Sequence, residues 1–193
     1  VLCVDDAELV LWQSVDFGND HELLKNLVEE TPWRQEQVTV WGKTYDQPRL
    51  VAWYGDDAQS YSYSGITLSA LPWTLALLRT KDKVETLCQS SFNSVLLNYY
   101  RDHRDGMGFH SDDEPELGPA PVIASVTVGA ARHFVLKHRY RKDVANVKLL
   151  LPSGSVLLMK GATQKNWKHG IPKVTKPCGP RINLTFRQIL DQN

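Results

Sequence analysis

Apolar residues recur with a helical period in the first part of the chain. Asn19 followed by Glu22 predicts a helix N-terminus with a reciprocal cap. The apolar positions 23, 24, 27 and 28 continue this helix until Pro32. Pro72 predicts the start of a second helix that ends before Ser90. Its apolar side is predicted to consist of Leu75, Leu78 and Leu87.

Short β-like runs make up most of the remaining chain. Two of them, over 37–41 and 47–53, surround a turn near Gly42. Six more follow residue 91, separated by Gly and Pro, over 92–100, 122–128, 133–138, 147–151, 155–159 and 181–187. Short strands at this spacing indicate a double-sheet sandwich or jelly roll, with the two helices packed outside. We therefore expect a mainly β fold with flanking helices, in one domain over 1–193.

Within this domain, residues 1 to about 90 are expected to form a helix-and-hairpin cover, and about 91–193 the jelly-roll core. A chain of 193 residues suits one domain. Its 22 basic and 22 acidic residues give zero net charge, which disfavours a large nonspecific nucleic-acid surface. Cys3, Cys88 and Cys178 are scattered, which favours a reducing compartment. No apolar run approaches the roughly 18 residues of a membrane span. We expect an intracellular protein, cytoplasmic if bacterial and nuclear if eukaryotic, with no membrane and no obligate protein partner.

The first candidate chemistry is an H-x-D pair, His110 and Asp112. In an extended segment, alternate residues share a face. His169 can supply a third ligand. Two imidazoles and one carboxylate form the facial triad of non-haem Fe(II) oxygenases, and zinc can use the same ligands. Since six histidines are present, an H-x-D pair also arises easily by chance.

The last predicted strand, over 181–187, carries the second signal. Arg181, Asn183, Thr185 and Arg187 alternate with apolar residues and therefore share one face. Alternation alone favours an edge strand with a solvated polar face. Arginine, however, binds carboxylates in a planar, bidentate manner, so an inward polar face would suit a dicarboxylate. Asn98 and Tyr100, two apart on another strand, are either further pocket residues or an ordinary strand end.

These features together resemble the AlkB family of Fe(II) and 2-oxoglutarate dependent nucleic-acid dealkylases. The site motifs of the resemblance are Asn98-x-Tyr100, His110-x-Asp112, His169 and Arg181-x-Asn183-x-x-x-Arg187. Outside the site it includes Pro48-Arg49, Tyr54-Gly55-Asp56, Tyr61 to Gly65, Ile123 to Val126 and Trp167-Lys168-His169. It covers about residues 37–190 and is most similar to the subfamily that acts on double-stranded DNA.

The resemblance implies a jelly roll with an N-terminal nucleotide-recognition lid, and a function in direct reversal repair. His110, Asp112 and His169 would hold Fe(II), and 2-oxoglutarate and O2 would be cosubstrates. The 2-oxoglutarate pocket would consist of Asn98, Tyr100, Arg181, Asn183 and Arg187. Arg181 would bind the distal carboxylate, and Arg187 would lie near the metal. N-methyl groups of 1-methyladenine or 3-methylcytosine would leave as formaldehyde.

A flipped base is implied as the substrate, because a base inside a duplex cannot reach a buried metal. By the same resemblance, Tyr61 and Tyr63 clamp this base against the His110 ring, and Asp113 and Glu114 recognise its exocyclic amine. From the residues alone, the two tyrosines could equally pack on the core, and the two acids could be ordinary surface residues.

Contacts to the nucleic acid are the last implied feature. Trp41, between Val40 and Gly42, corresponds to an aromatic wedge that fills the gap left by the flipped base, or it folds onto the core. Arg49 resembles a lesion-side or backbone contact. Phosphate contacts are expected from a cluster of basic residues, which otherwise form a solvated face: Arg132, Lys137, Arg139, Arg141, Lys142 and Lys148. The expected partner is alkylated DNA, with duplex favoured over single strands. The alternative is an AlkB-type demethylase acting mainly on RNA.

Overall fold

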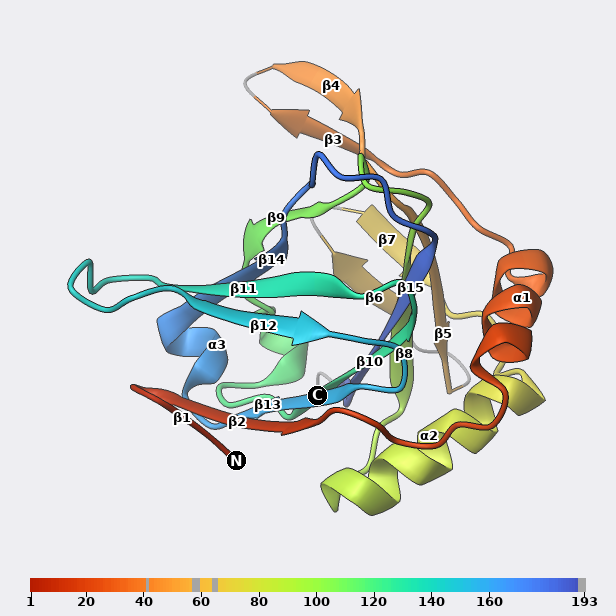
Figure 1. Ribbon diagram of the computed structural model, residues 1–193, viewed down its shortest axis with the longest axis horizontal. Helices are drawn as coiled ribbons and strands as arrows, with labels where there is room; N and C mark the ends of the chain where they lie inside the picture. The colour runs from red at the N-terminus through yellow and green to blue at the C-terminus, as the bar shows by residue number, and fades with distance from the viewer. Residues whose placement is uncertain (41, 57–59, 64–65, 191–193) are drawn as a thin grey trace.

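Two antiparallel sheets face each other and form the body of the protein (Figure 1). The computed structural model describes residues 1–40, 42–56, 60–63 and 66–190. The larger sheet contains, in spatial order, β1 (Leu2–Val4), β2 (Ala7–Trp12), β13 (Val156–Lys160), β10 (Ile123–Gly129), β15 (Arg181–Arg187), β8 (Ser94–Tyr100) and β5 (Leu50–Gly55). The smaller sheet contains β12 (Val147–Leu151), β11 (Arg132–His138), β14 (Trp167–Ile171) and β9 (Met107–His110). The predicted jelly roll is confirmed, and each of the six later strands lies within two residues of its predicted limits.

Apolar residues occupy both sides of the larger sheet, for two different reasons. On one side they pack between the sheets, where Ile123 and Leu157 meet Phe134, Leu136 and Trp167 of the smaller sheet. On the other side, the β15 residues Ile182, Leu184 and Phe186 pack in a cluster with Leu27, Leu77 and Val84 of the two long helices. The space between the sheets is thus left for the polar face of β15, which is the face that carries the candidate site.

The first long helix, α1 (Asp20–Glu30), follows its prediction. The side chain of Asn19 accepts hydrogen bonds from the backbone N–H groups of His21 and Glu22, at 3.1 and 3.2 Å. The helix ends at Thr31, because the residue before Pro32 is disfavoured in a helical conformation. Figure 1 places α1 and α2 side by side against the larger sheet.

The second long helix, α2 (Leu75–Cys88), corrects the prediction in two respects. It begins after Pro72, because Thr74 is the N-cap and its hydroxyl accepts from the Leu77 N–H at 3.2 Å. Its buried residues are Leu77, Thr80, Val84 and Cys88, whereas Leu75 is 74% exposed and Leu78 36%. Both sets of residues follow the helical period, so the period alone did not decide which face is buried.

Several strands before residue 90 were also wrongly assigned or missed. The hairpin consists of β3 (Gln37–Val40) and β4 (Lys43–Asp46), whereas β5 pairs with β8 in the larger sheet. A second small hairpin pairs β6 (Ser60–Tyr63) with β7 (Ile66–Ser69). Since β1, β2 and β5 also belong to the larger sheet, the core does not begin at residue 91.

The remaining elements are short. A 3-10 helix, η1 (Pro115–Leu117), follows the candidate metal ligands, and a single-turn helix, α3 (Thr163–Asn166), precedes β14. Figure 1 shows the β3–β4 hairpin standing away from the body. In the described part of the chain, no helix combines the length and apolar character that a membrane crossing requires.

Candidate metal centre and its adjoining pocket

The three predicted metal ligands lie together between the sheets. His110 ends β9 and is paired in register with His169 on β14. Asp112 follows two residues later, with its Oδ1 3.4 Å from His110 Nε2 and its Oδ2 3.9 Å from His169 Nε2. The three potential ligand atoms lie within 4.8 Å of one another, so these side chains can hold one metal ion.

A glycine allows this close pairing of β9 and β14. A Cβ atom on Gly170 would lie 2.8 Å from the Met107 carbonyl oxygen and 3.2 Å from the Gly108 carbonyl carbon. Any side chain would therefore push β9 away from β14. The glycine next to His169 thus keeps the two histidine-bearing strands at the separation the site needs.

The histidines are held with their lone pairs available. His110 Nδ1 lies 2.9 Å from the Gly108 carbonyl oxygen, which can only accept, so Nδ1 carries the proton and Nε2 is free to bind a metal. The His169 ring stacks on Phe134, with 5.0 Å between the centroids and 19° between the planes. Burial lowers the pKa of His169 to about 3, and His110 and Arg187 act in the same direction. His169 is therefore neutral at neutral pH.

Asp112 is ionised although it is only 1% exposed. Burial by itself raises the pKa of this carboxyl, but Arg187 and the two histidines outweigh it and hold the pKa well below its usual value. Arg187 Nη2 lies 2.9 Å from Asp112 Oδ2. Arg187 thus lies beside the candidate metal ligand Asp112.

The ligand set fits Fe(II). Asp112 Oδ1 is buried without a hydrogen-bond partner in the described part of the chain, and it lies next to His110 Nε2. A buried carboxylate oxygen without a donor is costly, and a cation at this position would satisfy it. Two imidazoles and one carboxylate would leave open coordination positions, which is the pattern of non-haem Fe(II) sites.

A polar pocket adjoins the metal ligands. The register of β15 with β8 pairs Arg181 with Tyr100 and Asn183 with Asn98. A cavity reaches from the metal ligands to this face and is lined by Leu96, Asn98, Tyr100, Met107, His110, Asp112, Ser125, Phe134, Met159, His169, Gly170, Ile171, Asn183, Thr185 and Arg187. The pocket and the ligands therefore form one continuous site.

Arg181 lies fully buried beside this cavity. Its Nη2 donates to Thr127 Oγ1 and to Asn183 Oδ1, both at 3.0 Å. Its Nε and Nη1 are buried and have no hydrogen-bond partner in the described part of the chain. Burial lowers the pKa of Arg181 to about 10, which still leaves the guanidinium charged at neutral pH. A buried cation with unused donors is suited to an anionic ligand group.

The two asparagines orient arginines. Asn98 Oδ1 accepts from Arg49 Nε at 2.8 Å. Asn183 Oδ1 accepts from Arg181 Nη2 and from Ser125 Oγ, and its Nδ2 donates to Thr185 Oγ1 at 2.7 Å. Their direct contact with 2-oxoglutarate stays a prediction.

Three further residues support the site, although the sequence patterns did not point to a role for them. Ser125 and Thr127 pair in register with Thr185 and Asn183 of β15 and bond to the same polar network. Two polar residues alternating within an apolar strand were the available signal. Gln164, which accepts from the Asp112 N–H at 3.0 Å, lies on a helix too short to show a period.

Of the predicted base-recognition residues, Asp113 and Glu114 directly follow the metal-ligand candidate Asp112 in the chain. Asp113 is 52% exposed in its side chain and pairs with Arg139 at 2.7 Å. Glu114 is half-buried and occupies the N-cap position of η1, without a side-chain capping hydrogen bond. Tyr61 and Tyr63 lie on β6, paired with Leu68 and Ile66, but their side chains lie outside the described part of the structure.

The predicted nucleic-acid contacts are spread over different surroundings. Trp41 lies outside the described residues, between β3 and β4. Arg49 is only 4% exposed, so in this conformation it cannot reach a DNA backbone. Arg141 is half-exposed and pairs with Asp143 and Asp6 at 3.1 and 3.4 Å, and Lys142 is exposed. Arg139 points to Asp113 instead of to solvent.

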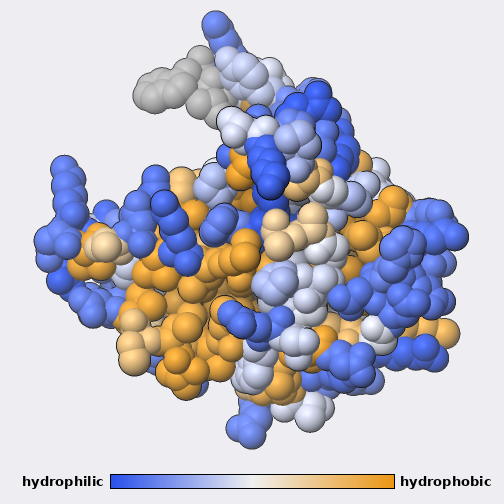
Figure 2. Space-filling model, in the orientation of Figure 1, coloured by the Kyte–Doolittle hydropathy of each residue, from blue (hydrophilic) through white to orange (hydrophobic). Residues whose placement is uncertain are grey.

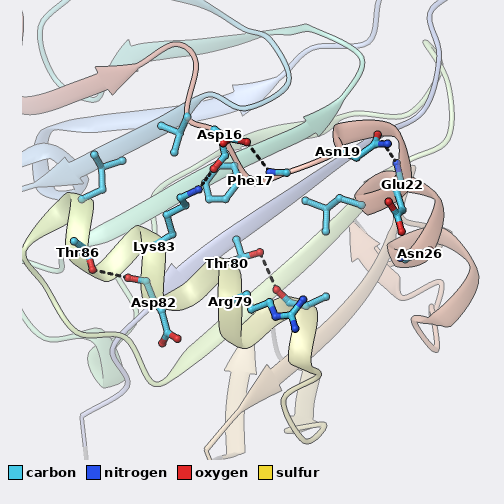
Figure 3. Close-up of a pocket in the computed structure, with 15 residues that line it drawn as sticks. Asp16, Phe17, Asn19, Glu22, Asn26, Arg79, Thr80, Asp82, Lys83 and Thr86 are labelled. Atoms are coloured by element: carbon cyan, nitrogen blue, oxygen red, sulfur yellow. Dashed lines mark hydrogen bonds between the residues drawn. The ribbon is translucent and has the colours of Figure 1, made fainter.

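A larger groove lies between α1 and α2, away from these residues (Figure 3). Its lining includes Asp16, whose carbonyl oxygen accepts from Lys83 Nζ, and Arg79 from α2. Within the described residues, the only group of three or more His, Cys, Asp or Glu side chains that could hold a metal is His110, Asp112 and His169. The candidate chemistry is therefore confined to the space between the sheets.

Comparison with known proteins points to one family. A sequence profile of the 2OG-Fe(II) oxygenase superfamily matches residues 14–187. The chain is 41% identical over 183 residues to the mouse alpha-ketoglutarate-dependent dioxygenase alkB homolog 3, covering 91% of this chain and 63% of that protein. It is 40% identical over 193 residues to the human DNA oxidative demethylase ALKBH2, covering 97% of this chain and 74% of that protein. The chain thus spans less than two thirds of the alkB homolog 3 proteins.

Solved structures agree in fold. OsALKBH1 superposes with a TM-score of 0.65 at 18% identity, over 93% of this chain and 97% of that one. A 2OG-Fe(II) oxygenase family oxidoreductase from Burkholderia pseudomallei gives a TM-score of 0.60 at 15% identity, over 93% and 84%. At these identities, the likeness supports the fold alone.

Proposed function

The chain belongs to the AlkB family of the 2OG-Fe(II) oxygenase superfamily, and from this premise we propose that it repairs DNA by oxidative removal of alkyl groups from bases. The carrying observation is the cluster of the half-buried His110 with the buried Asp112 and His169, which opens into a pocket flanked by a buried arginine with unused donors. Bound Fe(II) and 2-oxoglutarate, with O2, would supply oxidation of an N-methyl carbon that then leaves as formaldehyde.

The protein's own residues orient these groups. His110, Asp112 and His169 would hold the iron, and this ligand set would leave coordination positions open for the cosubstrate and O2. Arg181 would receive the distal carboxylate of 2-oxoglutarate, because its buried Nε and Nη1 have no hydrogen-bond partner among the described residues. Arg187 pairs with Asp112 and keeps this carboxylate ionised, so that Asp112 would be available to the iron as an anionic ligand. Ser125 and Thr127 keep the Arg181 and Asn183 side chains in place.

The base enters from the exposed side of His110, whose ring is 25% exposed. We propose that Tyr61 and Tyr63 stack on it and that Asp113 and Glu114 accept from its exocyclic amine. An N1-methyl on adenine or an N3-methyl on cytosine leaves a cationic base, which an aromatic face stabilises by roughly 0.5–2 kcal/mol. Such a base pairs poorly, so less free energy is needed to flip it out.

Duplex DNA is the substrate form we propose. Figure 2 shows the surface hollowed between the projecting β3–β4 hairpin and the β11–β12 loop that carries Arg141 and Lys142. A duplex lying there would meet the β3–β4 hairpin on one side and basic residues on the other, and we propose Trp41 as the wedge. The relatives named DNA oxidative demethylase support DNA, and an RNA substrate is the competing outcome.

The test is mass spectrometry of oligonucleotides that carry one 1-methyladenine, as single-stranded DNA, duplex DNA and RNA. The protein is loaded anaerobically with Fe(II), then given 2-oxoglutarate and O2, with His110→Ala as the control. We expect loss of one methylene mass, fastest on duplex DNA and absent in the variant. Turnover on RNA alone would contradict the DNA assignment, and turnover by His110→Ala would contradict the metal site.

A further inference from the structure

Arg139 occupies a different environment from the other basic residues of its loop. It follows β11 directly, and its guanidinium turns back toward the segment that carries the metal ligand Asp112. Arg139 Nη1 lies 2.7 Å from Asp113 Oδ2, 3.2 Å from the Gln164 carbonyl oxygen and 3.5 Å from Ser111 Oγ. Its backbone N–H also donates to the Asn166 carbonyl oxygen at 2.7 Å. Arg139 is thus fixed at its main chain and its side chain.

The segment over 111–113, which Arg139 contacts, is also held by hydrogen bonds to Gln164 and Trp167. The backbone N–H of Asp112 donates to Gln164 Oε1 at 3.0 Å, and Ser111 Oγ donates to the Trp167 carbonyl oxygen at 2.9 Å. Gln164 is 2% exposed, so this anchor is buried. The backbone leading into Asp113 is therefore fixed, and the direction of the Asp113 carboxylate depends on Arg139.

Arg141 behaves in the opposite way, although it is only two residues away. His138 Nδ1 accepts from the backbone N–H groups of Tyr140 and Arg141, at 3.2 and 2.9 Å, and this turn separates the two arginines. Arg141 pairs with acids at the outer side, Asp143 and Asp6. One arginine of the loop thus points to the site, and the next points away from it.

We propose that Arg139 is a positioning residue that orients Asp113 toward the substrate base and so sets a preference for bases with an exocyclic amine. This inference rests on the proposed function. Arg139 engages Oδ2 of Asp113, which leaves Oδ1 to accept from the amine. Without Arg139, the half-exposed carboxylate turns into solvent, so both its attraction for an amine and its repulsion of a carbonyl weaken.

The alternative role for Arg139 is contact with a DNA phosphate. The two roles differ in how the affinity depends on the base and on the salt concentration. A phosphate contact contributes equally to every base and adds roughly 0.7 to the salt slope of single-strand binding. If Arg139 positions Asp113, loss of Arg139 changes the ratio of the affinities for the two bases. The dependence of the affinity on salt concentration then stays unchanged. Because an exposed ion pair contributes little to folding, the stability of the protein will not distinguish the two roles.

The experiment measures binding of the full chain without iron to single-stranded oligonucleotides, by fluorescence anisotropy at several salt concentrations. One oligonucleotide carries 1-methyladenine, which has an amine, and the other 3-methylthymine, which has a carbonyl oxygen at the matching position. Arg139→Ala is compared with Arg141→Ala, which removes the same charge from the same loop. We expect Arg139→Ala to reduce the preference for 1-methyladenine by about 3- to 10-fold, as for one hydrogen bond to a charged group, without a change of salt slope.

Arg141→Ala should weaken both oligonucleotides equally and lower the slope by roughly 0.7. The inference would be overturned if Arg139→Ala weakened binding of the two oligonucleotides equally and also lowered the salt slope. Asp113→Asn combined with Arg139→Ala should lose no more preference than Asp113→Asn alone, and additive losses would also overturn it. If Arg139→Ala does not fold, Arg139→Gln takes its place and should show the same loss of preference.

A failure of the proposed function can be distinguished from a failure of the inference about Arg139. If the iron-loaded wild-type chain demethylates neither oligonucleotide, duplex or single-stranded, the proposed function is overturned and this inference with it. If the wild type demethylates 1-methyladenine and Arg139→Ala lowers kcat/KM equally for the two bases, only the inference is overturned.

Discussion

Asp112 and Arg187 form a buried ion pair, with Arg187 Nη2 2.9 Å from Asp112 Oδ2 and side chains only 1% and 5% exposed, respectively. The same carboxylate is the only anionic ligand in the candidate metal site of the described chain. The Asp112 carboxylate therefore pairs with the Arg187 guanidinium and would also bind the metal ion. Several measurable consequences depend on this sharing and on the pocket around it.

Arg187→Met should destabilise the metal-free protein by roughly 3–5 kcal/mol, because it leaves the Asp112 carboxylate buried without its cation. Added Mn(II) should restore part of this loss, since the metal replaces the missing charge. Thermal unfolding with and without Mn(II) measures both effects. We expect a larger Mn(II)-induced rise in Tm for the variant than for the wild type, and equal rises would contradict the sharing of Asp112.

The matched control is the double variant Asp112→Asn with Arg187→Met, in which neither charge remains. It should be closer in stability to the wild type than Arg187→Met alone, because a neutral pair carries no unpaired buried charge. It should also show no Mn(II) response. Additive destabilisation in this cycle would mean that the two residues act independently.

His169→Ala should weaken binding of Co(II), used as an air-stable substitute for Fe(II), by more than about 100-fold, since loss of an outer partner of a metal ligand alone costs roughly 10- to 100-fold. Titration calorimetry measures this directly. His133→Ala is the control, because His133 is exposed on β11 and lies outside the ligand group. Similar Co(II) affinities for the two variants would remove His169 from the site.

Arg181→Met should weaken binding of 2-oxoglutarate to the Mn(II)-loaded protein by roughly 10- to 100-fold, the equivalent of one charge-assisted interaction. Its stability should stay near that of the wild type, because the substitution also removes two buried donors without partners in the described chain. Calorimetric titration and urea unfolding give the two quantities.

Arg132→Met provides the contrast for Arg181. Arg132 also lies close to Tyr100, with 6.0 Å from its Cζ to the ring centroid, and it donates to the carbonyl oxygens of Asp102, Asp105 and Pro172. Its removal should lower stability through these main-chain bonds. If Arg132→Met weakened the binding of 2-oxoglutarate as much as Arg181→Met does, the assignment of the distal carboxylate to Arg181 would be wrong.

Leu77→Ala should lower the free energy of unfolding by about 2–5 kcal/mol, because Leu77 is 1% exposed and its removal leaves a cavity under α2. Leu75→Ala on the same helix should change it by less than about 0.5 kcal/mol, because Leu75 is 74% exposed. Urea unfolding of the two variants compares the buried face with the face first expected from the sequence. Equal losses would contradict the observed orientation of α2.

Trp41→Ala should reduce kcat/KM more on duplex than on single-stranded substrate, because only a duplex leaves a gap for a wedge to fill. Tyr45→Ala is the control, since Tyr45 is another aromatic of the same hairpin, 53% exposed on β4. Demethylation assays on matched duplex and single-stranded oligonucleotides measure both ratios. Equal losses for Trp41→Ala on the two substrates would remove the wedge role.

The sequence predicted the structure best where polar residues of a candidate site alternate with apolar residues along a strand. The strand over 181–187 was predicted with its correct limits, and its arginines share a face because side chains alternate in any extended strand. Alternation by itself favoured a solvated edge, however. Only pairing with β10 on one side and β8 on the other makes β15 central and buries all seven of its residues.

Short elements could not be predicted in this way. β9 and β14 have four and five residues and contain glycine, so neither period nor propensity marks them as strands. They exist because β14 pairs with β9 on one side and with β11 on the other. The same holds for the buried face of α2, which was chosen by the sheet beneath it.

By itself, the sequence determined the family, the mainly β fold and the identity of the metal-type ligands, because these depend on residue types and on periods carried by the chain. Only the tertiary structure decided that Asp112 is shared with Arg187, that Arg49 is buried against Asn98, and that Arg139 points to Asp113 while Arg141 points outward. Except for the outward direction of Arg141, these relationships join residues far apart in the chain. Their distances are set by the packing of one sheet on the other and by the turn at His138, which no local pattern encodes.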